Sequence, residues 1–274
     1  MIMKTIIVAT DFSPAALNAA HYAAQMAMAI NAKLVLLHVC QVPVTYGEVP
    51  AMVNEGDMIH DAELLLLKLK DELLNKAKKI VDIDAEVTAG IFFTELKRYS
   101  ESIMPYTIVM GCQGTSAVDH FLLGSHAVHA VKNLEWPLIT VPPGAKFTAL
   151  KKIGLACDLN KVVETTPVEE IKLLLNDFKA ELHVLNTGKQ KTFDPDIIFE
   201  SGQLQEMLMT VKPQYHFITS ENIDEGIIEF ADKNTIDLLV VLPKRHRLLD
   251  MLFHKSHTKN LVLHSHVPVM ALHH

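Results

Sequence analysis

The sequence predicts an α/β protein built from two similar domains, each an open parallel sheet covered by helices. Short apolar segments of strand length alternate with longer amphipathic segments along the whole chain. This alternation is typical of parallel strands that are buried on both faces. The chain also repeats itself, because four segments of its first half recur in the same order in its second half. Such a repeat indicates the tandem duplication of one α/β unit.

The four repeated segments are short and apolar, and most are strand-like. The pairs are "KTIIVATDFS" (4–13) with "KKIGLACDLN" (151–160), "AKLVLLHV" (32–39) with "AELHVLNT" (180–187), "YTIVMG" (106–111) with "DLLVVL" (237–242), and "WPLITVPP" (136–143) with "VPVMAL" (267–272). The segment "PPGAKFTAL" (142–150) separates the copies, so we expect one domain over residues 1–145 and another over 146–274. The last strand of each copy is an apolar edge that needs cover. We therefore expect these strands to join the domains as an internal pseudo-dimer.

The elements of the first half follow one another as alternating strands and helices. A strand over 5–9 precedes a helix over 14–30, for which Ser13 is the expected N-cap and Pro14 the first helical residue. A second helix over 57–79 has leucines at helical spacing with charges opposite. The remaining expected elements are strands over 33–38, 84–88, 106–110 and 138–141 and helices over 94–103 and 125–133.

The composition of the chain argues against several classes of function. Of the 274 residues 49% are hydrophobic, enough for a large core, and the net charge of −7 with neutral histidines repels the phosphates of nucleic acid. The opening "MIMKTIIVATDFS" has an apolar run too short for a secretory signal or a membrane span. The three cysteines are odd in number and lack metal-type spacing, as expected of reduced thiols. We expect a cytoplasmic protein that binds neither nucleic acid nor membrane.

The stretch "VMGCQGTSAVDHFLLGSHAV" (109–128) is the strongest candidate for a ligand site. It leaves the end of a predicted strand and leads into a predicted helix, and ligands of open parallel sheets bind at such carboxyl ends. Backbone N–H groups exposed by its glycines, together with the helix N-terminus, suit an anion. The alternative to an anion site is that the glycines only allow the chain to turn. Neither a Walker loop nor a dinucleotide fingerprint is present.

The spacing of this stretch resembles the nucleotide loop of the universal stress protein family. It reads Gly, two residues, Gly, nine residues, Gly-Ser. The segments "IIVATDFSPAALNAAHYAAQMA", "LVLLHV", "VMG" and "PLITVPP" are similar to that family's first, second, fourth and fifth strands with its first helix. A tandem arrangement is a known form of the family. The resemblance implies an adenine-nucleotide alpha-hydrolase-like, Rossmann-like fold and an adenine nucleotide (ATP, ADP or AMP) as ligand.

The family's binding residues carry over where the motif agrees. Asp11 resembles the aspartate that lies near the nucleoside, with Thr10 beside it, and Val39 resembles the residue whose backbone meets the adenine. The three glycines and the serine of the loop resemble the phosphate-binding residues. The resemblance therefore implies a nucleotide site in the first half, with the candidate residues Thr10, Asp11, Val39, Gly111, Gly114, Gly124 and Ser125.

Two departures from the family pattern concern the phosphates. The first loop lacks the basic residues that ATP-binding members commonly carry, and it contains Asp119. A carboxylate beside a triphosphate is unfavourable without a bridging cation, so either fewer phosphates are preferred or Mg²⁺ is needed. In the second half Leu242, Arg245 and Lys255 stand where the three glycines stand in the first. We expect this second loop to be degenerate and its domain not to bind ATP in the family manner.

No catalytic or metal site emerges from the remaining residues. The 15 histidines give no dependable set of three or four metal ligands. No Gly-x-Ser-x-Gly elbow is present, and Cys112 is interpreted as a buried or loop-filling residue. Any ATP hydrolysis should be slow. The expected function is a stress-response regulatory binding module, the alternative is a nucleotide-free interaction scaffold, and an enzyme of the wider fold ranks third. Homodimer formation and the protein partner stay open.

Overall fold

The computed structural model describes residues 3–41, 54–78, 81–112, 123–186, 195–243 and 257–273. Within these ranges the strands are β1 (Thr5–Ala9), β2 (Lys33–Cys40), β3 (Ile83–Ala89), β4 (Thr107–Gly111), β5 (Leu138–Val141), β6 (Lys152–Ala156), β7 (Glu181–Asn186), β8 (Gln214–Phe217), β9 (Leu238–Val241) and β10 (Val269–Ala271). The helices are α1 (Pro14–Ile30), α2 (Glu55–Lys76), α3 (Phe92–Ile103), α4 (Leu123–Asn133), α5 (Val162–Thr165), α6 (Val168–Phe178), α7 (Pro195–Met207), the short 3₁₀ helix η1 (Met209–Val211), α8 (Ile223–Lys233) and α9 (His257–His264).

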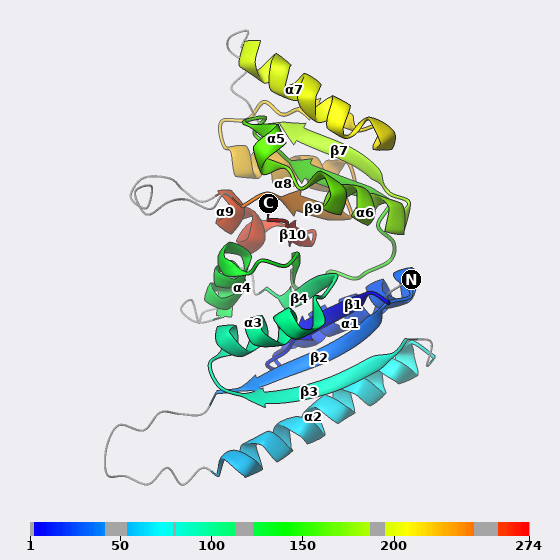
Figure 1. Ribbon diagram of the computed structural model, residues 1–274, viewed down its shortest axis with the longest axis vertical. Coiled ribbons are helices and arrows are strands. Elements are labelled where there is room, and N and C mark those ends of the chain that lie inside the picture. The colour runs from blue at the N-terminus through cyan, green and yellow to red at the C-terminus, as the bar shows by residue number, and fades with distance from the viewer. Residues whose placement is uncertain are drawn as a thin grey trace, which may run out of the picture.

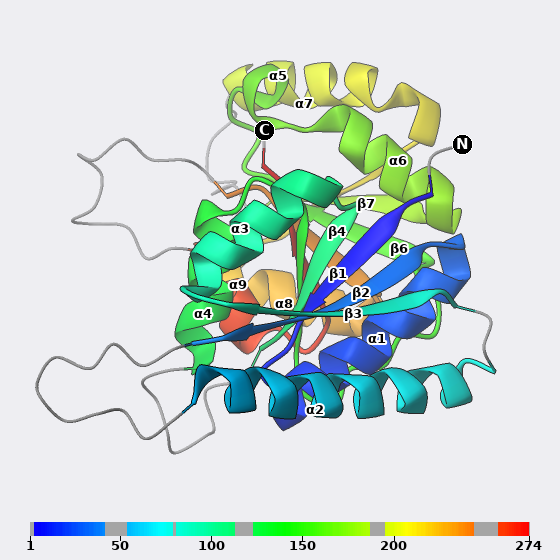
Figure 2. The same cartoon turned by 60° about the horizontal axis from the view of Figure 1, so that its bottom comes forward.

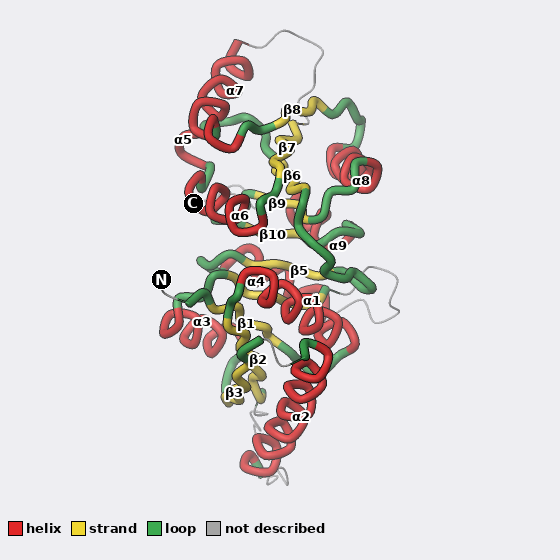
Figure 3. The backbone as a smooth tube through the Cα atoms, turned by 90° about the vertical axis from the view of Figure 1, so that its right-hand side faces the viewer, coloured by secondary structure: helices red, strands yellow, loops and turns green. Residues whose placement is uncertain are grey.

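The strands of both halves form one ten-stranded sheet. Its order is β3-β2-β1-β4-β5-β10-β9-β6-β7-β8, so each half has the same internal order (Figure 1). The two last strands, β5 and β10, meet in the middle of the sheet (Figure 3). All neighbouring strands are parallel except β5 and β10, which pair antiparallel with Val269 opposite Thr140 and Ala271 opposite Leu138. The two-unit α/β fold and the predicted joining of "PLITVPP" with "VPVMAL" are confirmed. A division of the chain between residues 145 and 146 stays a prediction.

Helices from both halves cover each face of the sheet. One core contains buried side chains of α1, α2, α6 and α7, and the other contains buried side chains of α3, α4, α8 and α9. Figure 3 shows the strands as a central layer with helices on both sides. Since α1 contacts α6 and α4 contacts α9, both cores run across the junction of the halves. The apolar runs of the central strands are thereby explained, because successive residues enter opposite cores.

The predicted boundaries in the first half agree with the structure to within two residues, except that α2 ends at Lys76 and not at residue 79. β1, α1 and β5 have the predicted bounds, and the Ser13 side chain accepts a hydrogen bond from the backbone N–H of Ala16 at 3.3 Å, as an N-cap should. Helix α4 begins at Leu123 instead of Ser125. The sequence reasoning ended the loop at Gly124, whereas a glycine is tolerated in the first turn of a helix.

Polar and ionic contacts also link the halves. The ammonium group of Lys4 forms an ion pair with Asp177 of α6 and lies 5.1 Å from the ring centre of Tyr106. The buried Cys112 donates through its Sγ to the carbonyl of Val262 in α9, at 3.2 Å. The first of these contacts lies at the amino ends of the strands and the second at the carboxyl ends. The halves are therefore tied together at both ends of the sheet.

Two neighbouring histidines near the outer end of the second half make stability depend on pH. Nδ1 of His183 in β7 lies 3.0 Å from Nε2 of His216 in β8, and His183 is only 6% exposed. Burial, followed by the charges of His216 and Lys152, lowers the pKa of His183 below its ordinary value of 6.5, and burial lowers the pKa of His216. The folded chain therefore resists protonation that the unfolded chain accepts.

We expect the free energy of unfolding to fall as the pH drops from about 6.5 toward the lowered pKa values. Below pH 6.5 the unfolded state binds more protons at these positions than the folded state, so acid favours unfolding. Urea denaturation at pH 7.5 and pH 5.5 measures the change. In the double variant His183→Gln with His216→Gln, the difference between the two pH values should shrink. An equal difference in parent and variant would assign the pH dependence to other groups.

Candidate functional site

The chain reverses its direction across the sheet between β1 and β4. From β1 it moves outward to β2 and β3, and then returns to place β4 and β5 on the other side of β1. β1 and β4 lie side by side and parallel (Figure 2). Where the strand order reverses in this way, the helices diverge and leave a crevice at the carboxyl ends of the strands. The candidate residues that follow β1 and end β4 lie at the carboxyl ends of these two strands.

The residues after β1 form a tight and strained turn. Backbone N–H of Thr10 donates to the Leu37 carbonyl at 3.0 Å, and Oγ1 of Thr10 accepts from the backbone N–H of Phe12 at 3.1 Å. Phe12 has φ 62°, a left-handed conformation that is costly for a bulky residue. Asp11 is exposed and accepts from the backbone N–H of Ser13 through Oδ1 at 3.0 Å. Thr10 thus shapes the turn, while Asp11 presents a carboxylate at the strand end.

Val39 reaches this site through its backbone. Its side chain is 7% exposed and packs in the core shared with α3 and α4. Lys33 donates to Lys4 and Leu37 accepts from Thr10, so odd-numbered residues of β2 turn their backbone groups toward β1. The register of the two strands ends at Ala9 opposite Leu37. The N–H and C=O of Val39 therefore point past the end of β1.

A hydrogen bond braces the ends of β1 and β2. Nδ1 of His38 lies 2.8 Å from the carbonyl oxygen of Thr10, and the His38 ring lies 4.7 Å from the Phe12 ring. Sequence reasoning missed both residues. The histidine in "LLHV" was a visible polar interruption of an apolar strand, whereas nothing in the sequence marked Phe12 for a positive φ.

Gly111, at the end of β4, has a packing reason to be glycine. A Cβ at this position would lie 2.4 Å from the backbone carbon and oxygen of Ala15 and 2.7 Å from the nitrogen of Ala16. The first turn of α1 thus presses directly on the strand end. The next residue, Cys112, is 2% exposed, and burial raises the pKa of its thiol to about 11. Cys112 is a buried residue and not a reactive thiolate, as the sequence suggested.

The loop that follows is only partly described. Gly114 and Asp119 lie in 113–122, outside the described residues. Gly124 and Ser125 lie in the first turn of α4, whose opening N–H groups have no acceptor within the helix. The structure brings Thr10, Asp11, Val39 and Gly111 to the carboxyl ends of three adjacent strands, β2, β1 and β4. The binding role of all seven candidates stays a prediction.

The second half repeats the turn with other side chains. Backbone N–H of Cys157 donates to the Leu185 carbonyl at 3.1 Å, and Leu159 has φ 50° and donates to Sγ of Cys157 at 3.4 Å. Nδ2 of Asn186 donates to the Cys157 carbonyl at 3.1 Å, in the place of His38. Asp158 is exposed like Asp11. The strained turn is therefore a property of the fold and does not distinguish a ligand-binding half.

The predicted difference between the halves concerns the residues of the two loops, glycines in the first and bulky residues in the second. The second loop lies largely outside the described residues. Arg245 and Lys255 fall in 244–256, which is not described, and Leu242 is half-buried after β9. Beyond that loop, Nδ1 of His257 lies 2.7 Å from Oδ1 of Asp224, and Asn260 donates to Oδ2 of the same carboxylate at 2.7 Å. In the first half the corresponding His126 instead stacks on Phe92, with ring centres 5.5 Å apart.

No group of three or more His, Cys, Asp or Glu side chains is arranged to hold a metal ion in the part of the chain that the structure describes. Among the helices described, none is both long and apolar enough to cross a bilayer.

The parallel sheet, with its strand order reversing between β1 and β4, defines a doubly wound α/β protein, the class in which ligands bind at the strand-order reversal. The sequence model of the Universal stress protein family matches residues 3–142 and again residues 150–273. The chain belongs to that family and carries two copies of its domain.

The chain is similar to several known proteins of this family. A curated universal stress protein of Methanocaldococcus jannaschii is 32% identical over 143 residues, which cover 50% of this chain and 81% of the relative. A crystal structure of a universal stress protein from Archaeoglobus fulgidus matches 100% of this chain and 99% of its own with a TM-score of 0.75 at 15% identity. A family member from Arabidopsis thaliana, solved with AMP bound, matches 52% of this chain and 93% of its own, with 22% identity and a TM-score of 0.35.

We expect Gly111→Ala to lower the free energy of unfolding by about 1–3 kcal/mol, because the new methyl group would force α1 away from β4. The matched control is Gly202→Ala in α7, where an added Cβ meets nothing within 4 Å. Since alanine is the better helix former, the control should be neutral or more stable by about 0.5–1 kcal/mol. Urea denaturation compares the two variants. Equal effects would contradict the close approach of α1 to the strand end.

Proposed function

We propose that this universal stress protein is a regulatory binding module that holds an adenine nucleotide in its first half. The observation that carries the proposal is the juxtaposition of backbone groups of Val39, which extend past the end of β1, with the exposed carboxylate of Asp11. Asp11 follows β1, where the strand order reverses between β1 and β4, and Val39 lies at the end of the neighbouring strand β2. The point of reversal is the preferred ligand position of such sheets.

The proposed contacts follow from the chemistry of the nucleotide. An adenine edge offers a donor next to an acceptor, and the N–H and C=O of Val39 supply the complementary pair. The Asp11 carboxylate has one oxygen engaged by Ser13 and can accept from a ribose hydroxyl through the other. N–H groups at the first turn of α4, around Gly124 and Ser125, suit the phosphates. Gly114 is assigned to the phosphates on the sequence alone, and Thr10 and Gly111 shape the site.

The number of phosphates depends on the charge of the loop. Its segment between Gly114 and Gly124 has one acidic residue and no lysine or arginine. We therefore propose that AMP and ADP bind without a metal, whereas ATP binding is strengthened by Mg²⁺. The proposal assigns no catalytic residue, so any ATP hydrolysis would be slow.

We also propose a cytoplasmic location. Cys40, Cys112 and Cys157 are all buried, and an odd number of cysteines cannot all pair within one chain. This is the pattern of thiols kept reduced.

One observation favours a second candidate, a scaffold that binds no nucleotide. The close approach of α1 explains Gly111 without any ligand. In that case the loop would serve only to connect β4 with α4, and the protein would act through partners alone. Mass spectrometry of gently purified protein separates the candidates, because a co-purified adenine nucleotide contradicts the scaffold.

We expect AMP to bind the parent protein in isothermal titration and Asp11→Ala to weaken binding about tenfold, the loss of one charge-assisted hydrogen bond. The matched control is Asp158→Ala, the equivalent carboxylate of the second half, which should bind AMP like the parent. ADP and ATP, each with and without Mg²⁺, complete the series. No binding by the parent at millimolar AMP, or equal effects of the two substitutions, would remove the nucleotide proposal.

A further inference from the structure

The outer edge of β3 offers backbone groups that the sheet does not use. β3 is one of the two end strands and pairs along its whole length with β2. Leu34 donates to the carbonyl of Asp82, and Gly90 donates to the carbonyl of Cys40. Even-numbered residues in this segment therefore turn toward β2, and the N–H and C=O groups of Ile83, Ala85 and Val87 face away from the sheet. An edge of this kind is a template for one more strand.

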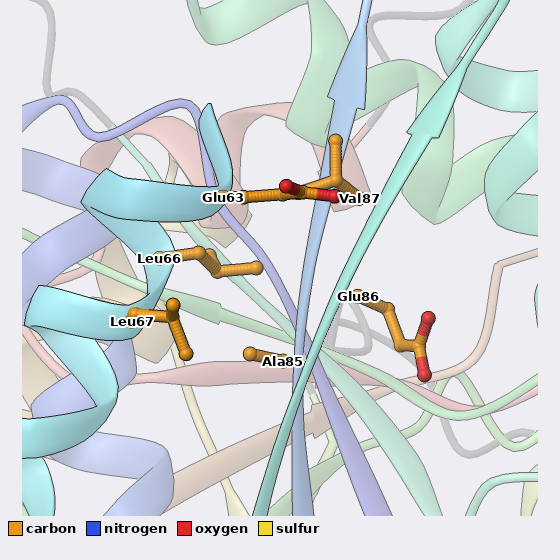
Figure 4. Close-up of a pocket in the computed structure, with 6 residues that line it drawn as sticks. All are labelled: Glu63, Leu66, Leu67, Ala85, Glu86 and Val87. Carbon is orange, nitrogen blue, oxygen red and sulfur yellow. The ribbon is translucent and has the colours of Figure 1, made fainter. Parts of the chain in front are cut away.

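A pocket lies along this edge, under α2. It has a volume of about 260 Å³ and is lined by Glu63, Leu66, Leu67, Ala85, Glu86 and Val87. Figure 4 shows Glu63, Leu66 and Leu67 reaching from α2 toward β3, while Glu86 points to the other side of the strand. Of the two leucines that line the pocket, Leu67 is 51% exposed and Leu66 is 1% exposed. The pocket thus combines outward-facing strand backbone with a wall that consists of two leucines and the carboxylate of Glu63.

The two faces of β3 differ in chemistry. Ala85 and Val87 face α2 and pack against its apolar core. Asp84 and Glu86 alternate with them and therefore lie on the opposite face, where Asp84 forms an ion pair with Lys33. A strand added at this edge would place alternate side chains beside leucines and beside carboxylates.

The acidic residues of β3 determine which kind of strand can pair with this edge. If β3 of a second copy paired with this edge in antiparallel fashion, the acidic residues of one strand would lie near those of the other, and like charges across a strand pair are destabilising. Basic side chains on the same face would instead be attracted to the carboxylates. The opposite end strand, β8, reads Gln-Tyr-His-Phe and has no acidic residue, so this selection applies to β3 alone.

We propose that the β3 edge binds an extended peptide segment in which apolar and basic residues alternate. The segment adds as an eleventh strand, pairing with the outward backbone groups of Ala85 and Val87. Its apolar side chains enter the pocket beside Leu66 and Leu67, and its lysines or arginines lie beside Glu86. This is strand addition, a common mode of peptide recognition in which backbone hydrogen bonds supply affinity and alternate side chains supply specificity.

The test uses the full chain and a fluorescein-labelled peptide of sequence Val-Lys-Val-Lys-Val-Lys-Val, followed by fluorescence anisotropy. We expect saturable binding that weakens as salt rises, because part of the attraction is ionic. Val87→Pro should weaken it about tenfold or more, since proline removes an outward N–H and leaves the β2 ladder intact. Glu86→Lys should also weaken it about tenfold, the scale of one charge-assisted contact. The matched control is Glu229→Lys at an exposed position of α8, which should bind like the parent.

Further measurements distinguish strand addition by a peptide from the alternatives. Amide hydrogen exchange at Ala85 and Val87 should slow when the peptide is added, and urea midpoints should show that each variant is folded. The proposal is overturned if the parent fails to bind at millimolar peptide, if Val87→Pro binds equally well, or if a peptide with glutamate in place of lysine binds as tightly. It is also overturned if sedimentation without peptide shows a dimer that Val87→Pro abolishes, because a second copy would then occupy the edge.

Discussion

The antiparallel pairing of β5 with β10 is the contact on which the rest of the architecture depends. Both strands are fully buried and apolar, and without each other they would be exposed sheet edges. Their union places them at the centre of a ten-stranded sheet and lets the helix layers of the two halves meet, α1 with α6 and α4 with α9. Each fully buried aliphatic side chain in such a layer contributes about 1.5–3 kcal/mol.

The same junction connects the second half to the candidate site of the first. Cys112, which follows the end of β4, donates to the Val262 carbonyl in α9 and is buried against the second half. The base of the glycine loop therefore rests partly on the other copy. A change in the packing of α9 would therefore act on Cys112, at the end of β4 from which the glycine loop starts.

The sequence predicted the fold well because its signals were local and repeated. Apolar runs located β1 and β5, and the Ser13 cap followed by Pro14 located the start of α1. The need to cover the apolar edge of each last strand predicted the meeting of β5 with β10, although the two strands are far apart in the chain. These signals follow from burial and capping, which act on short stretches of residues.

The site was predicted less completely because its geometry arises from tertiary contacts. Gly111 was selected as a ligand residue, but its lack of a side chain is already required by the backbone of Ala15. Val39 was carried over from the family, and the reason that its backbone groups extend past β1 is the register of two strands. The positive φ of Phe12 has no local sequence signal, since it belongs to a turn braced from β2 by His38.

Covalent linkage of the two copies has a further consequence for the β5–β10 contact. Two separate chains would meet at a rate and to an extent set by their abundance, and like copies would compete with unlike ones. In this molecule the two edges are tethered by residues 142–151 between β5 and β6, so their local concentration is fixed however dilute the protein is. Each copy can therefore accumulate its own substitutions, in its loops and on its outer strand, without a change in which copy it meets.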